Sequence, residues 1–142
     1  MSNILVVDDS PAVLKIVRLA LSSQGHNIII CESGEIALET LKTNSKIGLG
    51  IFDFNMPGIS GIELIQKSKK IMAQFKFKIL ILSVENKPEI ISKALLEGVD
   101  AWIVKPFKNE ELIKKVNELV EEDKQNLLFL FLPCILFLLS PY

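Results

Sequence analysis

Five side chains that could act as acids, bases or nucleophiles stand at the ends of short apolar runs. They are three carboxylates, one hydroxyl and one ammonium: Asp8, Asp9, Asp53, Ser83 and Lys105. If the apolar runs are strands of one parallel sheet, their carboxyl ends meet at the edge where such sheets bind ligands. The sequence therefore predicts that these five side chains converge on a single site.

The predicted group suits phosphoryl chemistry around a divalent cation. Two carboxylates about 4 Å apart repel each other by roughly 4 kcal/mol at an effective dielectric constant of about 20, so three together would hold a proton or recruit a cation. Mg²⁺ fits, because it is usually bound through one or two carboxylates and keeps several waters. A carboxylate could then attack a phosphoryl group, while the hydroxyl and the ammonium stabilise its oxygens.

Each of these residues also has an ordinary structural explanation. An Asp after a strand is usually a turn or helix-cap residue. Ser83 alone would be a cap, and Lys105 alone would be a solvated charge. We favour the functional interpretation because all five side chains occur together at the same predicted edge.

Five apolar runs of four residues, most of them β-branched or leucine-rich, are typical of strands buried on both faces. They are Ile4–Val7, Ile28–Cys31, Leu49–Phe52, Ile79–Leu82 and Ala101–Val104. The segments that follow have helical spacing, with predicted starts at Ser10, Ser33, Ser60, Asn86 and Asn109. Gly25 and Gly98 are predicted to end the first and fourth helices. This alternation predicts an α/β fold, a doubly wound five-stranded parallel sheet with five helices.

The composition excludes several functional classes. The 142 residues are 49% apolar and 23% charged, which excludes a disordered chain. The 16 basic and 17 acidic residues nearly balance, and Arg18 is the one arginine, which disfavours nucleic-acid binding. Two cysteines and one histidine exclude a disulfide framework and a multi-histidine metal centre. The first residues lack the features of a signal peptide.

Every charged residue lies at or before Lys124, so we divide the chain into a domain, residues 1–124, and an apolar tail, residues 125–142. The uncharged stretch Leu127–Leu139 would reach about 20 Å as a helix, short of the roughly 30 Å core of a bilayer. Pro133 would kink or stop that helix. Four interpretations are open: docking on a partner or a second copy, packing back on the domain, dipping into a membrane, or no selected role.

Four separated motifs of the domain resemble the receiver domain of two-component response regulators. They are Val6-Val7-Asp8-Asp9-Ser10, Asp53-Phe54-Asn55-Met56-Pro57-Gly58 with Gly61, Ser83, and Val104-Lys105-Pro106-Phe107. They occur in the right order, each follows a predicted strand, and the resemblance covers about residues 3–122. Stand-alone receivers of the chemotaxis-regulator type look most similar, which implies a flavodoxin-like strand order 2-1-3-4-5.

The resemblance implies a role for each acidic residue. Asp53 would accept the phosphoryl group from a phosphohistidine on a histidine kinase or phosphotransfer protein. Asp8 and Asp9 would form the acidic pair that binds Mg²⁺ together with Asp53, with Asp9 the more direct ligand. Asn55 would offer its backbone carbonyl to the metal. Mg²⁺ is the one cofactor that the resemblance implies.

The resemblance also implies how a phosphoryl group would be held and sensed. Ser83, where Thr is more usual, would hydrogen-bond it, and Lys105, whose bond to the following proline would be cis, would pair with it. Trp102 takes the place of the switch aromatic, usually Tyr or Phe, whose ring turns inward in the family; the bulk of Trp opposes that rotation. Asn55 and Glu85 stand where the family tunes the lifetime of the acyl phosphate.

These roles predict a cytoplasmic signalling switch and not a conventional enzyme. The protein would catalyse its own aspartyl phosphorylation and dephosphorylation, and would signal through the face formed by the fourth helix, fifth strand and fifth helix. We expect no DNA-binding domain after residue 124, and therefore contact with another protein or phosphate relay as the output. His26 precedes the second strand, at the opposite edge of the sheet, so the phosphoryl donor would be a separate molecule.

Three other functions suit the same fold class. A flavodoxin-like module for a small ligand would need a Gly/Ser/Thr-rich phosphate loop after the first strand, where Asp8 and Asp9 would repel phosphate. An aspartyl phosphatase usually shows Asp-x-Asp at that point. A pseudo-receiver that keeps the fold for docking alone would not need the complete set of five side chains.

Overall fold

The computed structural model describes residues 2–139, with the side chains of residues 122–131 and 135 left out. The strands are β1 (Asn3–Val7), β2 (Asn27–Cys31), β3 (Ile47–Phe52), β4 (Lys78–Ser83) and β5 (Ala101–Val104). The helices are α1 (Pro11–Ser22), α2 (Gly34–Thr43), α3 (Gly61–Ile71), α4 (Pro88–Leu96) and α5 (Asn109–Leu138). Strands and helices alternate along the chain, as the sequence predicts.

The strands form one parallel sheet in the order β2-β1-β3-β4-β5, which confirms the predicted flavodoxin-like topology. The register places Val7, the last residue of β1, beside Phe52, the last residue of β3. The amide of Asp53 continues this ladder by donating to the carbonyl of Val7 at 2.9 Å. The residues that follow β1 and β3 therefore leave the sheet side by side.

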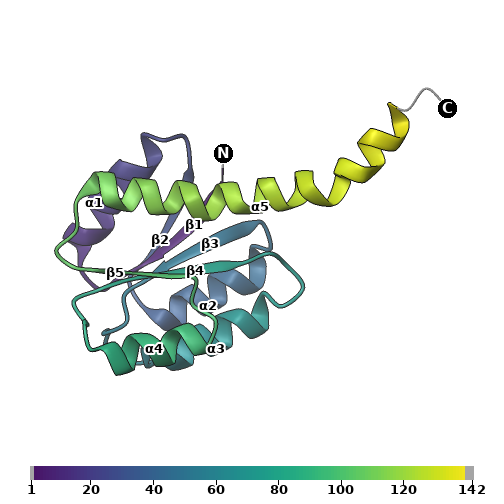
Figure 1. The fold of residues 1–142 in the computed structure, drawn as a ribbon. Helices are drawn as coiled ribbons and strands as arrows, with labels where there is room; N and C mark the ends of the chain where they lie inside the picture. The colour runs from purple at the N-terminus through teal and green to yellow at the C-terminus, as the bar shows by residue number, and fades with distance from the viewer. Residues whose placement is uncertain (1, 140–142) are drawn as a thin grey trace.

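Helices cover both faces of the sheet (Figure 1). On one face, α1 and α5 pack over alternate residues of the central strands, with Leu14 and Val116 among the buried side chains. On the other face, α2, α3 and α4 cover the remaining strand residues, with Leu41 and Ile65 among those buried. The central strands β1, β3 and β4 thus bury both of their faces, which is why they read as continuous apolar runs and not as alternating ones. The edge strands β2 and β5 are partly exposed.

The helix starts follow local hydrogen bonding at three of the predicted caps. The hydroxyls of Ser10, Ser33 and Ser60 each accept a hydrogen bond from the amide three residues later, which satisfies one of the free donors of a first turn. The prediction that Asn86 begins the fourth helix is wrong by one residue, counted at the cap position. Lys87 holds the cap position without a side-chain bond, and Pro88 is the first helical residue, where its fixed φ and missing N–H are tolerated.

The chain turns after α1 and α4 at glycines with left-handed backbone. Gly25 has φ +86° and Gly98 has φ +99°, a region that an L side chain rarely adopts. Both positions agree with the predicted helix ends.

The apolar tail continues α5 and does not form a separate element. The helix runs through Pro133 to Leu138 and extends past the sheet, bending near its end (Figure 1). Among the described tail residues, Leu136 is 60% exposed and Phe137 is 78% exposed, so this part of the tail does not pack back on the domain. No helix among the described residues is long and apolar enough to cross a bilayer.

Candidate functional site

The predicted acidic residues come together at the carboxyl ends of β1 and β3. One carboxylate oxygen from each of Asp8, Asp9 and Asp53 lies within 4.8 Å of the others. Asp8 is 2% exposed and Asp53 is 7% exposed, whereas Asp9 lies open to solvent. The cluster therefore has two buried carboxylates and one exposed carboxylate that a ligand can reach from solvent.

Lys105 brings a positive charge into this cluster. Its Nζ lies 2.7 Å from Asp8 Oδ2 and 3.6 Å from Asp53 Oδ2. The residue follows β5, and its backbone amide donates to the carbonyl of Ser83 at the end of β4 at 2.8 Å. The long side chain reaches from there past β4 and β3 to the end of β1. The bond between Lys105 and Pro106 is cis, as the resemblance implies.

Backbone amides hold the two buried carboxylates from the other side. Asp8 Oδ1 accepts from the amide of Ser10 at 2.9 Å, and Asp53 Oδ1 accepts from the amide of Asn55 at 3.1 Å. The sequence predicts Ser10 only as a helix cap. Its backbone amide also holds the Asp8 carboxylate, a role that residue type alone does not reveal. Asp9 has no hydrogen bond or ion pair among the described residues, so its carboxylate keeps its full capacity for a ligand.

Burial raises the pKa of Asp8 above its ordinary value of 3.8. Removal of the carboxylate from water is the main cause, because a charged group loses its hydration in a low-dielectric environment. The hydrogen bonds from Lys105 and the Ser10 amide oppose this effect, and the negative charge of Asp53 adds to it. The net result is that the folded protein holds a charged Asp8 at a cost.

Ser83 lies fully buried at the end of β4. Its Oγ accepts a weak hydrogen bond from the amide of Glu85 at 3.4 Å, and its carbonyl accepts the amide of Lys105. The structure therefore places Ser83 at the predicted edge of the sheet. Its hydroxyl bonds within its own loop and makes no hydrogen bond to the acidic residues described here.

Trp102 contacts both Phe54, in the loop after β3, and the loop after β4. Its ring lies 5.3 Å from that of Phe54, measured between centroids, and its Nε1 donates to the carbonyl of Glu85 at 3.1 Å. This bond supplies the partner that a partly buried indole N–H needs. The Asn55 side chain also reaches Glu85, at 3.5 Å, so Glu85 connects the loop after β3 with Trp102.

The donor set fits a hard divalent cation. Three carboxylates and one ammonium sum to a charge of −2, which one divalent cation would neutralise, and oxygen is the ligand atom that Mg²⁺ prefers. Both oxygens of Asp8 are engaged, one by Lys105 and one by Ser10. The exposed Asp9 carboxylate has no other partner among the described residues and, with Asp53 and Asp8 beside it, could hold Mg²⁺; the backbone carbonyl of Asn55 is a further ligand that the resemblance implies.

Known proteins share both the sequence pattern and the fold. Residues 4–117 match the family model of the response regulator receiver domain. The chain is 34% identical to a chemotaxis protein CheY homolog of Campylobacter jejuni over 123 residues, which cover 83% of this chain and 92% of the relative. It is 37% identical to chemotaxis protein CheY1 of Helicobacter pylori over 119 residues, which cover 80% and 93%.

A solved structure shows the same architecture. Chemotaxis protein CheY4 of Vibrio cholerae superposes with a TM-score of 0.77 at 31% identity, and the match covers 84% of this chain and 98% of that one. Residues 4–117, which match the family model, include the three aspartates of the acidic cluster.

The raised pKa of Asp8 predicts that metal-free Asp8→Asn is more stable than wild type at neutral pH. The folded state binds the Asp8 proton more tightly than the unfolded state, so stability is lost as pH rises through the folded pKa. Asn removes that loss and keeps an oxygen for the Ser10 amide. We expect a higher urea midpoint for the variant, with a gain that vanishes as pH falls below 3.8.

Asp9→Asn is the matched control, because it removes a neighbouring charge that is exposed, and it should change the midpoint little. A lower midpoint for Asp8→Asn at neutral pH would mean that the attraction of Lys105 outweighs desolvation, which contradicts the assignment.

Proposed function

The chain belongs to the response regulator receiver domain family, and on that premise we propose that it is a phosphorylation-dependent switch with Asp53 as the phosphoryl acceptor. The observation that carries this proposal is the convergence of Asp53, Asp8 and Asp9 with Lys105 at one edge of the sheet. A histidine kinase or phosphotransfer protein would be the donor, and Mg²⁺ the cofactor. Two free cysteines, Cys31 and Cys134, suit a reducing compartment such as the cytoplasm.

The proposed reaction transfers the phosphoryl group between two nucleophiles. An Asp53 oxygen attacks phosphorus, the bond from phosphorus to the donor nitrogen breaks, and the donor imidazole leaves with the electron pair of that bond. The bond from Asn55 N to Asp53 Oδ1 holds one carboxylate oxygen, which leaves Oδ2 as the oxygen that faces Lys105. Mg²⁺, when bound, would supply positive charge for the phosphoryl oxygens.

Lys105 is placed to pair first with Asp8 and then with a phosphoryl group on Asp53. Before transfer, Lys105 Nζ lies 2.7 Å from Asp8 Oδ2 and 3.6 Å from Asp53 Oδ2, so it is paired more closely with Asp8. A phosphoryl group on Asp53 carries more negative charge than the carboxylate it replaces. Lys105 would then pair with the phosphoryl oxygens, and such positioned charges contribute to the rate where charge develops.

Ser83 and Glu85 offer a route from the site to the surface. Ser83 Oγ would leave its weak bond to the Glu85 amide, at 3.4 Å, for a phosphoryl oxygen. Because the Glu85 carbonyl accepts from Trp102 Nε1, the loop after β4 and this indole would respond together. We propose that the surface of α4, β5 and α5 carries the output to another protein. Its exposed apolar side chains Leu95 and Leu96 support this.

For the tail, we propose docking on a partner, of which a second copy of the chain is the simplest. Large apolar side chains that stay in water favour association. Leu136, Phe137 and Leu138 are 60%, 78% and 80% exposed. They follow one another on a helix, so they point in different directions and no single face of the domain could cover them.

Asp53→Asn is predicted to abolish labelling of the protein by acetyl phosphate in the presence of Mg²⁺. The wild-type chain should gain one phosphoryl group by intact-protein mass spectrometry, and chelation of the metal should prevent that gain. Lys105→Ala should slow labelling by about 10²-fold, the loss typical when one electrostatic donor is removed from a transition state.

Glu32→Gln is the matched control, because it removes an exposed carboxylate from the end of β2 at the same edge and should label like wild type. Labelling that persists in Asp53→Asn would show that another residue is the acceptor. A wild-type chain that takes no label would favour a docking-only or small-ligand function.

The double substitution Leu136→Ser and Phe137→Ser is predicted to weaken self-association of the full chain. Burial of a large apolar side chain contributes about 1.5–3 kcal/mol, so loss of two should raise the dissociation constant by about 10²-fold or more. Light scattering over a concentration series measures this. Leu19→Ser, which removes an exposed leucine from α1, should leave association unchanged, and a monomeric wild type would contradict the proposal.

A further inference from the structure

The loop that connects Asp53 to α3 carries the backbone carbonyl of Asn55. Asn55, Pro57 and Gly58 are exposed, whereas Phe54, Met56 and Ile59 are partly buried and pack against the core. At its start, the amide of Asn55 bonds to Asp53 itself. The position of the Asn55 carbonyl therefore also depends on how the far end of the loop is attached.

The far end of the loop is attached to α2. Glu35 Oε1 accepts a hydrogen bond from the amide of Ile59 at 2.9 Å, and a carboxylate makes a stronger bond of this kind than a neutral acceptor. The fit around the bond is close. Gly58 has φ +88°, and a Cβ there would lie 2.6 Å from Glu35 Oε1. A Cβ on Gly34 would collide with the side chain of Ile59.

We propose that Glu35 is a positioning residue for the metal site, which fixes the loop of residues 54–59 from α2 so that the Asn55 carbonyl can join Asp9 and Asp53 on the cation. The inference rests on the proposed function, because it assigns a supporting residue to the same Mg²⁺ site. Groups that orient metal ligands in this way commonly control affinity without touching the metal.

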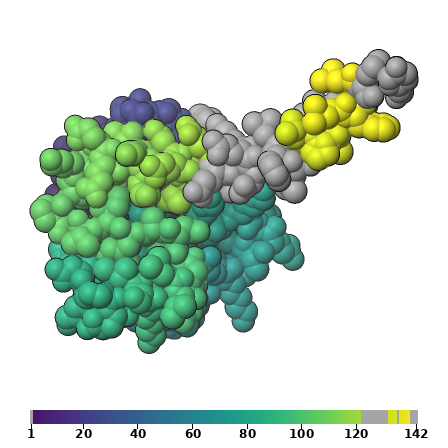
Figure 2. Space-filling model, in the orientation of Figure 1, coloured from purple at the N-terminus to yellow at the C-terminus, as the bar shows by residue number. Residues whose placement is uncertain are grey.

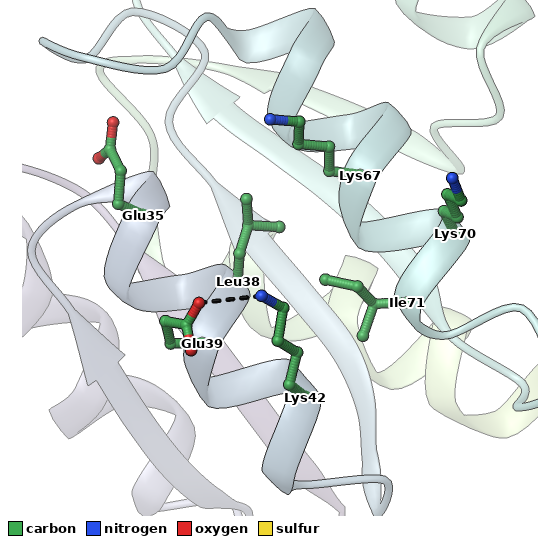
Figure 3. A pocket seen from close by; sticks show the side chains of 7 residues that line it. All are labelled: Glu35, Leu38, Glu39, Lys42, Lys67, Lys70 and Ile71. Atoms are coloured by element: carbon green, nitrogen blue, oxygen red, sulfur yellow. Dashed lines mark hydrogen bonds and ion pairs between the residues drawn. The ribbon is translucent and has the colours of Figure 1, made fainter.

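The surroundings of Glu35 favour this role over an ordinary surface charge. Figure 3 shows Glu35 at the start of α2. Glu35 and three lysines are among the residues that line a hollow of about 410 Å³ between α2 and α3. Lys42 pairs with Glu39 at 2.9 Å, and Lys67 pairs with Glu63 at 2.8 Å. Glu35 makes no ion pair among the described residues. Its carboxylate serves the Ile59 amide instead.

A second explanation is that Glu35 acts through its charge alone, since a carboxylate in the first turn of a helix interacts favourably with the helix dipole. Two substitutions separate these roles. Glu35→Gln removes the charge but keeps an oxygen that can reach the Ile59 amide. Glu35→Asp keeps the charge but shortens the side chain by one methylene, which takes the carboxylate away from that amide.

The experiment is a Mg²⁺ titration of the full chain followed by amide NMR, with hydrogen exchange of the Ile59 amide measured on the same samples. We expect Glu35→Ala and Glu35→Asp to weaken Mg²⁺ binding by about three- to tenfold. Loss of a group that orients a metal ligand directly typically costs about tenfold or more, and Glu35 acts less directly, through the loop. The Ile59 amide should exchange faster in both. Glu35→Gln should stay within about twofold of wild type. Glu39→Gln, which removes a charge one turn further along α2, is the control.

The outcomes separate this inference from the proposed function. If wild type binds Mg²⁺ and all Glu35 variants bind it equally well, the positioning role is wrong and the proposed function stands. If Glu35→Gln is as weak as Glu35→Ala while Glu35→Asp matches wild type, the charge and not the loop bond is responsible, which also overturns the inference. If wild type does not bind Mg²⁺, both fail. Thermal unfolding of Glu35→Ala and Glu35→Asp shows that the comparison is made on folded protein.

Discussion

The contact of Lys105 with two buried carboxylates is the interaction on which the site depends. Asp8 and Asp53 follow neighbouring strands, and the backbone ladder between Val7 and Asp53 keeps their side chains close. Like charges at such separations repel strongly where water is excluded. Lys105, which follows β5, three strands away from β1 in the sheet, offsets part of that repulsion. Its Nζ lies 2.7 Å from Asp8 Oδ2. The remaining charge of −2 is left for a cation, so the fold holds the binding site at the expense of its own stability.

The arrangement of the sheet makes this possible. Strands buried on both faces form a rigid platform, and their carboxyl ends place chemistry-bearing residues from distant parts of the sequence at one edge. The parts that must move lie in loops, where hydrogen bonds are few and exposed. Ser83 ends β4, Glu85 lies in the loop that follows it, and Trp102 lies in β5. The bonds that Glu85 makes with the other two, at 3.4 Å and 3.1 Å, join the proposed phosphoryl site to the surface. Phosphorylation would thus change a small set of weak contacts against a fixed background.

The strands and the residues that converge at their ends could be predicted from the sequence, but the contacts between loops could not. The continuous apolar runs before Asp8, Asp53 and Lys105 identify buried parallel strands, and a parallel sheet leaves one edge on which those residues can meet. Side-chain bonds between loops follow no such periodicity. Glu35 bonding to Ile59 depends on the shape of the loop, as does Trp102 bonding to Glu85, and neither residue type nor spacing encodes that shape. In the tail, Pro133 is expected to kink or stop the helix, and the helix does not stop there but continues to Leu138.

Paramagnetic broadening by Mn²⁺, which favours the same oxygen ligands as Mg²⁺, tests the central claim most directly. Amide NMR of the full chain with a small fraction of one equivalent of Mn²⁺ reports which residues lie near the bound ion. If three carboxylates form one cation site, signals around Asp9, Asp53 and Lys105 should disappear first, and excess Mg²⁺ should restore them. Signals of α2 near Leu41 should persist. Broadening centred elsewhere, or spread evenly over the acidic surface, would contradict the account.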